Sequence, residues 1–365
     1  MRYTRRMQKI TLRTLPLALA LVTQNTTAEE PAWDNPADRY KDAWRAHADA
    51  TCPIPVDDIR HFVYFARDRD RLRDHPLLTH DRLEGAQVMY LWSELEPERG
   101  VYNFDRIETD VELLEAYGKK LWIQLQDATF YDQYQPAPAY MLSDEFSGGA
   151  VRQHTDEGET EGWVVKRWNP AVRERFAALL GALAERFDGR IAGINLQETA
   201  IGVRTETSPD FTPAAYVEAL KANMSALGAS FEISATMQYA NFMPGEWLPW
   251  EDEGYLESIY RHGQEIGVGL GAPDLMVTRR GQLNHALAMM HEHDYTVPLG
   301  IAVQDGNYVG VTGRETATDQ DQDSLVPLLH AFAADFLNVK LMFWVDQPPY
   351  FEQQVIPCLG DAPLQ

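Results

Sequence analysis

The sequence has few cysteines, only Cys52 and Cys358 among 365 residues. Neither has a nearby histidine or helix start that would activate a thiol, which argues against a catalytic cysteine. In an exported protein, two such residues are expected to pair as a disulfide that joins the two ends of the mature chain. Two free thiols are the alternative.

Long apolar runs are also missing, because no window after the first 30 residues is long enough to cross a membrane. The start, MRYTRRMQKITLRTLPLALALVTQNTTAEE, has arginines, a short apolar run from Leu15 to Val22 and small residues near Ala28. This layout is typical of a cleaved export signal, with a buried or interfacial helix as the alternative. We therefore expect a signal peptide at residues 1–28, and a secreted or periplasmic mature protein with no membrane segment.

Positive charge is scarce: 32 Lys and Arg stand against 55 Asp and Glu, for a formal net charge of -23. Such a field repels nucleic acids, anionic lipids and polyanionic sugars, so the expected partner is neutral or cationic. The acidic excess is spread along the chain, which equally fits a solvated acidic surface.

Cofactor motifs are missing as well. The segment after the first apolar strand, YFARDRDRLRDH (64–75), has no glycine for a dinucleotide or phosphate loop. The sequence has no serine elbow, no His-Glu-x-x-His and no Walker loop. HEHD (291–294) lies at a predicted helix end, where the helix dipole explains the histidines. We expect no cofactor and no metal.

What the chain does contain is an alternation of apolar strands and amphipathic helices, repeated about eight times. The expected strands are 61–66, 86–92, 120–127, 191–198, 231–239, 268–276, 298–305 and 339–346. This rhythm predicts a single (β/α)8 TIM barrel of class α/β over residues 29–365. An open doubly wound sheet is the competitor; barrel closure places the first and last strands, near which the two cysteines lie, side by side, which an open sheet does not require. Residues 131–168 are predicted to form a loop over the strand ends.

Polar and aromatic residues gather where the predicted strands end, which is where barrels place their chemistry. Each could be a cap or a loop hydrogen bond, but together they predict one site. The candidates are Trp92, Asp127, Gln197, Glu198, Tyr239, Asn241, Asp274, Gln304, Asp305 and Trp344. Among them, the rings of Trp92, Tyr239 and Trp344 are expected to stack on sugars.

The run YLWSELEPERGVYNFDRIETDVELLEAYGKKLWIQLQ (90–126) resembles the large clan of (β/α)8 glycoside hydrolases that includes β-galactosidases, cellulases and xylanases. The resemblance implies a carboxylate at the end of the fourth strand as acid/base, and Glu198 holds that position. Gln197 stands where the clan has asparagine. A structural ion pair of Glu198 with Arg204 or another basic residue is the alternative.

The clan's nucleophile is a Glu at the end of the seventh strand, but this sequence has Gln304 there and Asp305 beside it. Because an amide cannot form a glycosyl ester, three hypotheses follow. Asp305, or Asp127 or Asp274, is the second carboxylate; or the 2-acetamido group of the substrate attacks; or the barrel binds glycans without turnover. We expect a hydrolase of neutral or amino-sugar oligo- or polysaccharides, with Glu198 and Asp305 catalytic and the other candidates binding substrate.

Overall fold

The structure is a computed structural model that describes residues 35–155, 157–250, 253–312 and 324–360. The export signal predicted at residues 1–28 lies outside the described residues. Among the helices of the described ranges, none combines the length and apolarity that crossing a membrane requires.

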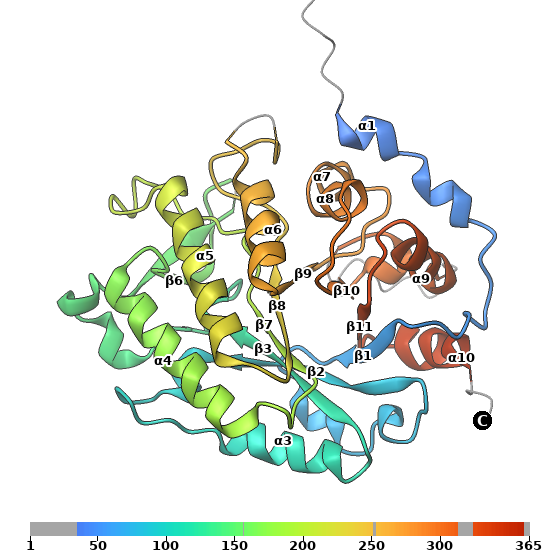
Figure 1. Cartoon of the computed structure of the whole chain (residues 1–365), viewed down its shortest axis with the longest axis horizontal. Coiled ribbons are helices and arrows are strands. Elements are labelled where there is room, and N and C mark those ends of the chain that lie inside the picture. Colours follow the sequence, from blue (N-terminus) through green and yellow to red (C-terminus); the bar gives the residue numbers. More distant parts are fainter. Residues whose placement is uncertain (1–34, 156, 251–252, 313–323, 361–365) are drawn as a thin grey trace, which may run out of the picture. The chain divides into compact units, whose positions relative to one another are not determined.

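Eight parallel strands close into a barrel, in the order β1, β11, β10, β9, β8, β7, β3 and β2 (Figure 1). The strands are β1 (Arg60–Tyr64), β2 (Leu83–Leu91), β3 (Lys120–Gln126), β7 (Gly193–Leu196), β8 (Ala235–Tyr239), β9 (Gly269–Ala272), β10 (Leu299–Val303) and β11 (Leu341–Val345). Each overlaps a predicted strand, so the predicted (β/α)8 fold is confirmed. All residues of β10 and β11 are buried, because the barrel interior takes one face and helices cover the other.

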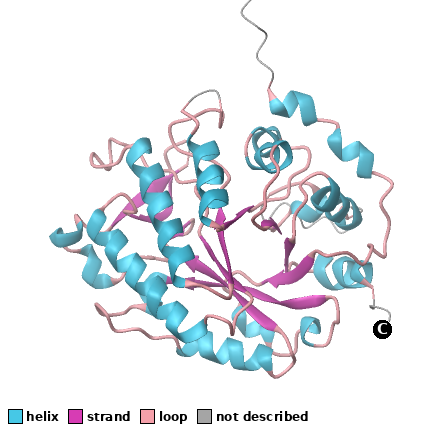
Figure 2. Ribbon diagram, viewed as in Figure 1, coloured by secondary structure: helices cyan, strands magenta, loops and turns pink. Residues whose placement is uncertain are grey.

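Helices alternate with the strands and lie outside the barrel (Figure 2). The longest are α4 (Pro170–Phe187) and α5 (Pro213–Ser230), which begin with a capping side chain, Asn169 or Thr212, followed by proline. The other α-helices of the described residues are α1 (Pro36–Tyr40), α2 (Trp92–Leu95), α3 (Asp105–Glu115), α6 (Tyr255–Ile266), α7 (Arg280–Asn284), α8 (Ala286–Glu292), α9 (Val326–Asp335) and α10 (Ile356–Leu359).

Large side chains fill the barrel interior below the strand ends. Phe62, Trp122 and Phe343, from β1, β3 and β11, pack against one another with ring centroids 5.1 to 5.6 Å apart. Beside them, the Gln87 amide donates hydrogen bonds to Asn195 and to the Tyr239 hydroxyl. This packed layer fills the interior of the barrel below the strand ends.

The segment between β3 and α4 differs from the loop predicted for residues 131–168. It contains β5 (Ala150–His154) and β6 (Thr160–Val165), which pair antiparallel, and β6 also pairs with β4 (Ala128–Thr129). Gly162 allows the close pairing, because a Cβ there would lie 2.1 Å from the Thr129 carbonyl oxygen. The short strands were missed because the segment is rich in turn residues, and backbone pairing rather than apolar alternation holds them.

Cys52 and Cys358 form a disulfide between the segment before β1 and helix α10, as predicted. The Ile54 amide also donates to the Cys358 carbonyl at 2.8 Å. On the chain-entropy model, a loop spanning 306 residues restricts the unfolded chain and stabilises the fold by up to ~5 kcal/mol.

His61 on β1 and His330 on α9 are buried together at the amino-terminal end of the barrel. His330 Nε2 lies 3.1 Å from an Asp57 carboxylate oxygen, and the Trp344 indole N–H donates to His61 Nδ1 at 3.2 Å. Burial, with a smaller contribution from the charge of His330, lowers the pKa of His61 from 6.5 to about 3.

Acid is therefore expected to destabilise the fold through His61. Its contribution is complete above pH 6.5 and is lost as the pH falls towards about 3, because only the unfolded residue gains a proton in that window. The slope from this one group is ~1.4 kcal/mol per pH unit. Urea unfolding at several pH values should show a shallower slope for His61→Gln and an unchanged slope for the exposed control His293→Gln. Equal slopes for all three proteins would contradict the prediction.

Candidate active site

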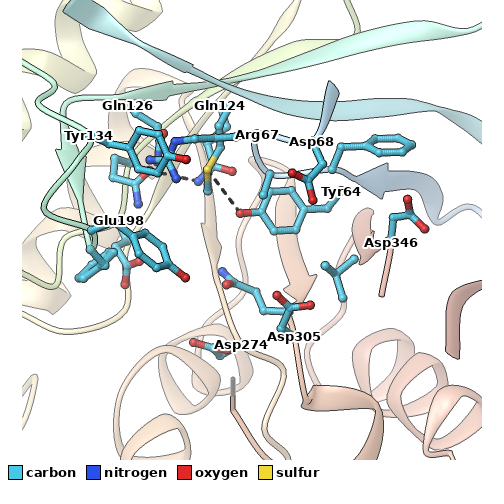
Figure 3. Close-up of a pocket in the computed structure, with 18 of the residues that line it drawn as sticks. Tyr64, Arg67, Asp68, Gln124, Gln126, Tyr134, Glu198, Asp274, Asp305 and Asp346 are labelled. Carbon is cyan, nitrogen blue, oxygen red and sulfur yellow. Dashed lines mark hydrogen bonds between the residues drawn. The ribbon is translucent and has the colours of Figure 1, made fainter. Parts of the chain in front are cut away.

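A pocket of about 670 Å³ opens at the carboxyl ends of the barrel strands (Figure 3). Five of the predicted site residues line it: Gln197, Glu198, Asp274, Gln304 and Asp305. Residues that the sequence analysis did not select line it too, among them Tyr64, Arg67, Asp68, Gln124, Gln126, Tyr131, Tyr134, Glu161 and Asp346. Figure 3 shows Gln124 and Gln126 beside Arg67 on one side of the pocket. Asp274 and Asp305 lie on the other side.

Glu198 follows β7 and is largely buried. Its Oε2 accepts a hydrogen bond of 2.6 Å from the Asn241 side-chain N–H. Burial raises the pKa of Glu198 to about 7; the Asn241 hydrogen bond acts to lower it and the charge of Asp274 acts to raise it. Near neutral pH this carboxyl therefore exists in both protonation states. A group that donates a proton and regains it in each catalytic cycle needs both states.

Asp127, a predicted site residue, is not among the residues that line the pocket. Arg167 holds it with two hydrogen bonds, of 2.5 and 2.6 Å, and both side chains are almost fully buried. The same guanidinium donates to the backbone carbonyl of Glu198 at 3.2 Å. Asp127 thus supports the Glu198 segment through Arg167, and a role as second carboxylate or in substrate binding is not supported.

Asp274 and Asp305 both line the pocket, after β9 and β10. Asp274 has a left-handed backbone with φ of +64°, an uncommon conformation for a non-glycine residue that recurs at functional sites. Asn307 donates to its carboxylate at 3.3 Å, and burial raises the pKa of Asp274. Among the carboxylates, Asp274 has the largest effect on the pKa of Glu198.

The stacking role expected of three aromatic residues is not supported, because their rings are buried in the core. Trp92 donates its indole N–H to Glu96 at 2.9 Å, and Trp344 donates to His61. Tyr239 lies under the pocket, in the layer with Gln87. All three side chains are at most 1% exposed, so no ring face is open to a ligand.

Other aromatic residues lie at the pocket instead. Tyr131 is 58% exposed, and Tyr134 packs edge-on against it with ring centroids 6.2 Å apart. Both belong to the segment after β4, which the sequence analysis treated as a loop without assigning these rings.

The sequence did contain a signal for two other pocket residues. Gln124 and Gln126 are two positions apart in β3, and residues at this spacing on a strand share a face.

One group of side chains in the described part of the chain has the spacing of metal ligands: Asp57, His61 and His330. The indole of Trp344 can only donate, so His61 Nδ1 is the acceptor and the ring proton lies on Nε2. That nitrogen then offers no lone pair to a metal. The residues do not fit a metal ion without rearrangement of this hydrogen bond.

Removing the Asp127 charge is expected to leave Arg167 as an unpaired buried cation. We expect Asp127→Asn to lower the free energy of unfolding by ~3–5 kcal/mol, as for other broken buried ion pairs. The control Asp132→Asn removes an exposed ion pair with Arg152 and should cost at most ~1 kcal/mol. Urea unfolding measures both free energies of unfolding. Equal losses for the two variants would show that the pair of Asp127 and Arg167 stabilises the fold no more than an exposed ion pair does.

No protein-family model and no curated protein matches the sequence. Among solved structures, the chain is similar to endo-glycoceramidase II from Rhodococcus sp. in a cellobiose-like imidazole complex, with 13% identity and a TM-score of 0.50 over 82% of this chain and 76% of that chain. Its lactosyl-enzyme intermediate matches with 14% identity, a TM-score of 0.50 and the same coverage. GH5_18 from Bifidobacterium longum subsp. longum has 12% identity and a TM-score of 0.49, over 79% of this chain and 70% of that chain. Similarity at such low identities shows the fold alone.

Proposed function

We propose that the chain is a glycoside hydrolase that acts on a neutral or amino-sugar oligo- or polysaccharide, with Glu198 as its acid/base. The observation that carries the proposal is Glu198 itself: a largely buried carboxyl at the end of a barrel strand, with a pKa raised to about 7. Such a group can protonate a leaving oxygen near neutral pH. The lactosyl-enzyme intermediate of the structurally similar endo-glycoceramidase supports sugar chemistry on this fold.

In the proposed reaction, Glu198 gives its proton to the glycosidic oxygen as the bond between that oxygen and the anomeric carbon breaks. A second carboxylate either attacks the anomeric carbon or takes a proton from the attacking water. We assign this role to Asp305, because it follows β10 and lines the pocket. Gln304 beside it is an amide and cannot do either. Asp274 is the alternative, supported by its influence on Glu198.

The presence of Gln304 in the pocket favours a second candidate function. If neither aspartate takes part, the barrel either binds glycans without cleaving them or uses the 2-acetamido group of the substrate as nucleophile.

The predicted secretion stays part of the proposal, supported by the disulfide, which forms in oxidising compartments. The acidic net charge supports a partner other than nucleic acid.

The proposal predicts that Glu198→Gln lowers turnover by about 10²- to 10⁴-fold, because the amide cannot donate the proton. Release of reducing sugar from neutral polysaccharides and aryl glycosides measures turnover, and equilibrium binding of the same glycans should change little. Glu98→Gln, at an exposed position, is the matched control. A wild-type protein that binds glycans and releases no sugar would establish the non-catalytic alternative.

A comparison of two variants tests the second carboxylate. We expect Asp305→Asn to reduce turnover as strongly as Glu198→Gln, and Asp274→Asn to reduce it less. If Asp274→Asn is the more damaging change, the partner is Asp274. If both variants keep full turnover on 2-acetamido sugars alone, the substrate supplies its own nucleophile.

The pH dependence should identify Glu198 as the acid. Because the acid must be protonated, kcat/KM is expected to fall as the pH rises through about 7, where Glu198 loses its proton. Asn241→Ala removes the N–H that favours the carboxylate, so the falling limb should move to higher pH. The exposed control Asn103→Ala should leave the limb in place. A profile that Asn241→Ala does not move would argue against Glu198 as the titrating group.

A further inference from the structure

Four non-acidic side chains that line the pocket are Arg67, Gln124, Gln126 and Tyr134, here called the Arg67 wall (Figure 3). Arg67 is reached from β1 through Ala66, whose φ of +49° is unusual for a residue with a side chain. A hydrogen bond of 2.8 Å from the Met89 amide to the Ala66 carbonyl holds this turn against β2. The backbone is therefore strained where it presents Arg67 to the pocket.

Arg67 differs from Arg167 and Arg175 in its partners. Arg167 and Arg175 each hold a buried carboxylate, of Asp127 and Glu96. Arg67 instead lies against the Tyr134 ring, 4.1 Å from its centroid. Within the described residues, its Nε and Nη2 are buried and have no hydrogen-bond partner. These two atoms form the edge of a guanidinium that donates two parallel hydrogen bonds.

Among the described residues, the two glutamines of the Arg67 wall have acceptor atoms without donors, whereas Arg67 has donor atoms without acceptors. The side-chain carbonyl oxygens of Gln124 and Gln126 are buried, and no donor within the described residues reaches them. The Gln124 amide nitrogen is engaged, because it donates to the Gln197 carbonyl at 3.1 Å. Buried polar groups in native proteins are normally paired, so in the described part of the chain this wall has unpaired donors on Arg67, after β1, and unpaired acceptors on Gln124 and Gln126 of β3.

The mixture of donors and acceptors determines which ligand chemistry fits. A carboxylate or sulfate would satisfy Arg67, but its oxygens would face the two glutamine carbonyls as well. An ammonium group would satisfy the carbonyls and repel Arg67. A hydroxyl both donates and accepts, so a pair of neighbouring sugar hydroxyls satisfies all of these groups. The net charge of -23 and the acidic groups across the pocket also disfavour an anion.

We propose that the Arg67 wall is the subsite that binds the hydroxyl groups of one neutral sugar residue: the hydroxyls accept from Arg67 and donate to Gln124 and Gln126. Because Tyr134 lies over the guanidinium at 4.1 Å, the proposal requires this ring to move before a hydroxyl reaches Arg67. The inference rests on the proposed function only in taking the ligand to be a sugar, and it narrows the substrate to uncharged sugars, because an acetamido group, like a hydroxyl, both donates and accepts hydrogen bonds.

Binding to the full chain carrying Glu198→Gln tests the subsite without turnover. The probes are methyl β-glucoside, methyl β-galactoside and methyl β-mannoside, with methyl β-glucuronide as the anionic counterpart and methyl N-acetyl-β-glucosaminide as the acetamido counterpart. Isothermal titration should show the tightest binding for a neutral glycoside. Arg67→Met should weaken that binding about tenfold or more. Arg186→Met, which removes an exposed arginine on α4, is the matched control and should leave affinity unchanged.

A second variant tests the proposal even if Arg67→Met does not fold. Gln126→Glu is expected to give Arg67 an internal carboxylate, so the thermal midpoint should be maintained or raised while the affinity for the neutral glycoside falls about tenfold. If Gln126→Glu and Arg67→Met both leave this affinity unchanged, the wall is internal packing and the proposal is wrong. Preferential binding of the glucuronide would overturn the assigned ligand class.

Failure of the subsite and failure of the proposed function are distinguishable. Glycoside binding that depends on Arg67, without any sugar release by the wild-type protein, would support the subsite and reject hydrolysis. If the wild-type protein releases sugar and Arg67→Met leaves the glycoside affinity unchanged, hydrolysis is supported and the subsite is rejected.

Discussion

The parallel pairing of β1 with β11 closes the barrel, and the pocket depends on that closure. Backbone partners run from Arg60 with Leu341 to Tyr64 with Val345. The pairing brings the two ends of the chain's strand series together, and the disulfide of Cys52 and Cys358 joins the segments that flank it. Without closure, the residues after β1 would not face those after β9 and β10, and no single pocket would contain Arg67 and Asp305.

Within this frame, ion pairing separates structural carboxylates from chemically available ones. Asp127 is held by Arg167, Glu96 by Arg175, and Asp346 by Arg71 at 2.9 Å. Each of these buried carboxylates is paired with an arginine, which fixes its position. Glu198 has a neutral amide as its hydrogen-bond partner, so burial dominates and its pKa rises to about 7. The candidate acid is thus a largely buried carboxyl whose hydrogen-bond partner is a neutral amide and not an arginine.

Much of the fold was predictable because strand and helix periodicity is local. The eight apolar strands overlap their predicted ranges, and the caps at Asn169 and Thr212 mark helices α4 and α5. The antiparallel pair β5 and β6 was not predicted, because its pairing depends on partners rather than on apolar pattern. Five of the predicted site residues line the pocket, since residues that end barrel strands share one rim.

The barrel, its rim and the position of Glu198 at a strand end were predictable from the sequence, because spacing and hydrophobic pattern specify which side chains face the core. The contacts of each rim residue became visible in the folded chain alone. Asp127 lies within reach of Arg167, 40 positions away, and Trp344 reaches His61, 283 positions away. Arg67 faces the pocket because of the left-handed backbone at Ala66 and the ring of Tyr134. Such contacts join residues that are distant in sequence, so burial and charge pairing, which set the chemistry of a side chain, appear only once the chain is folded.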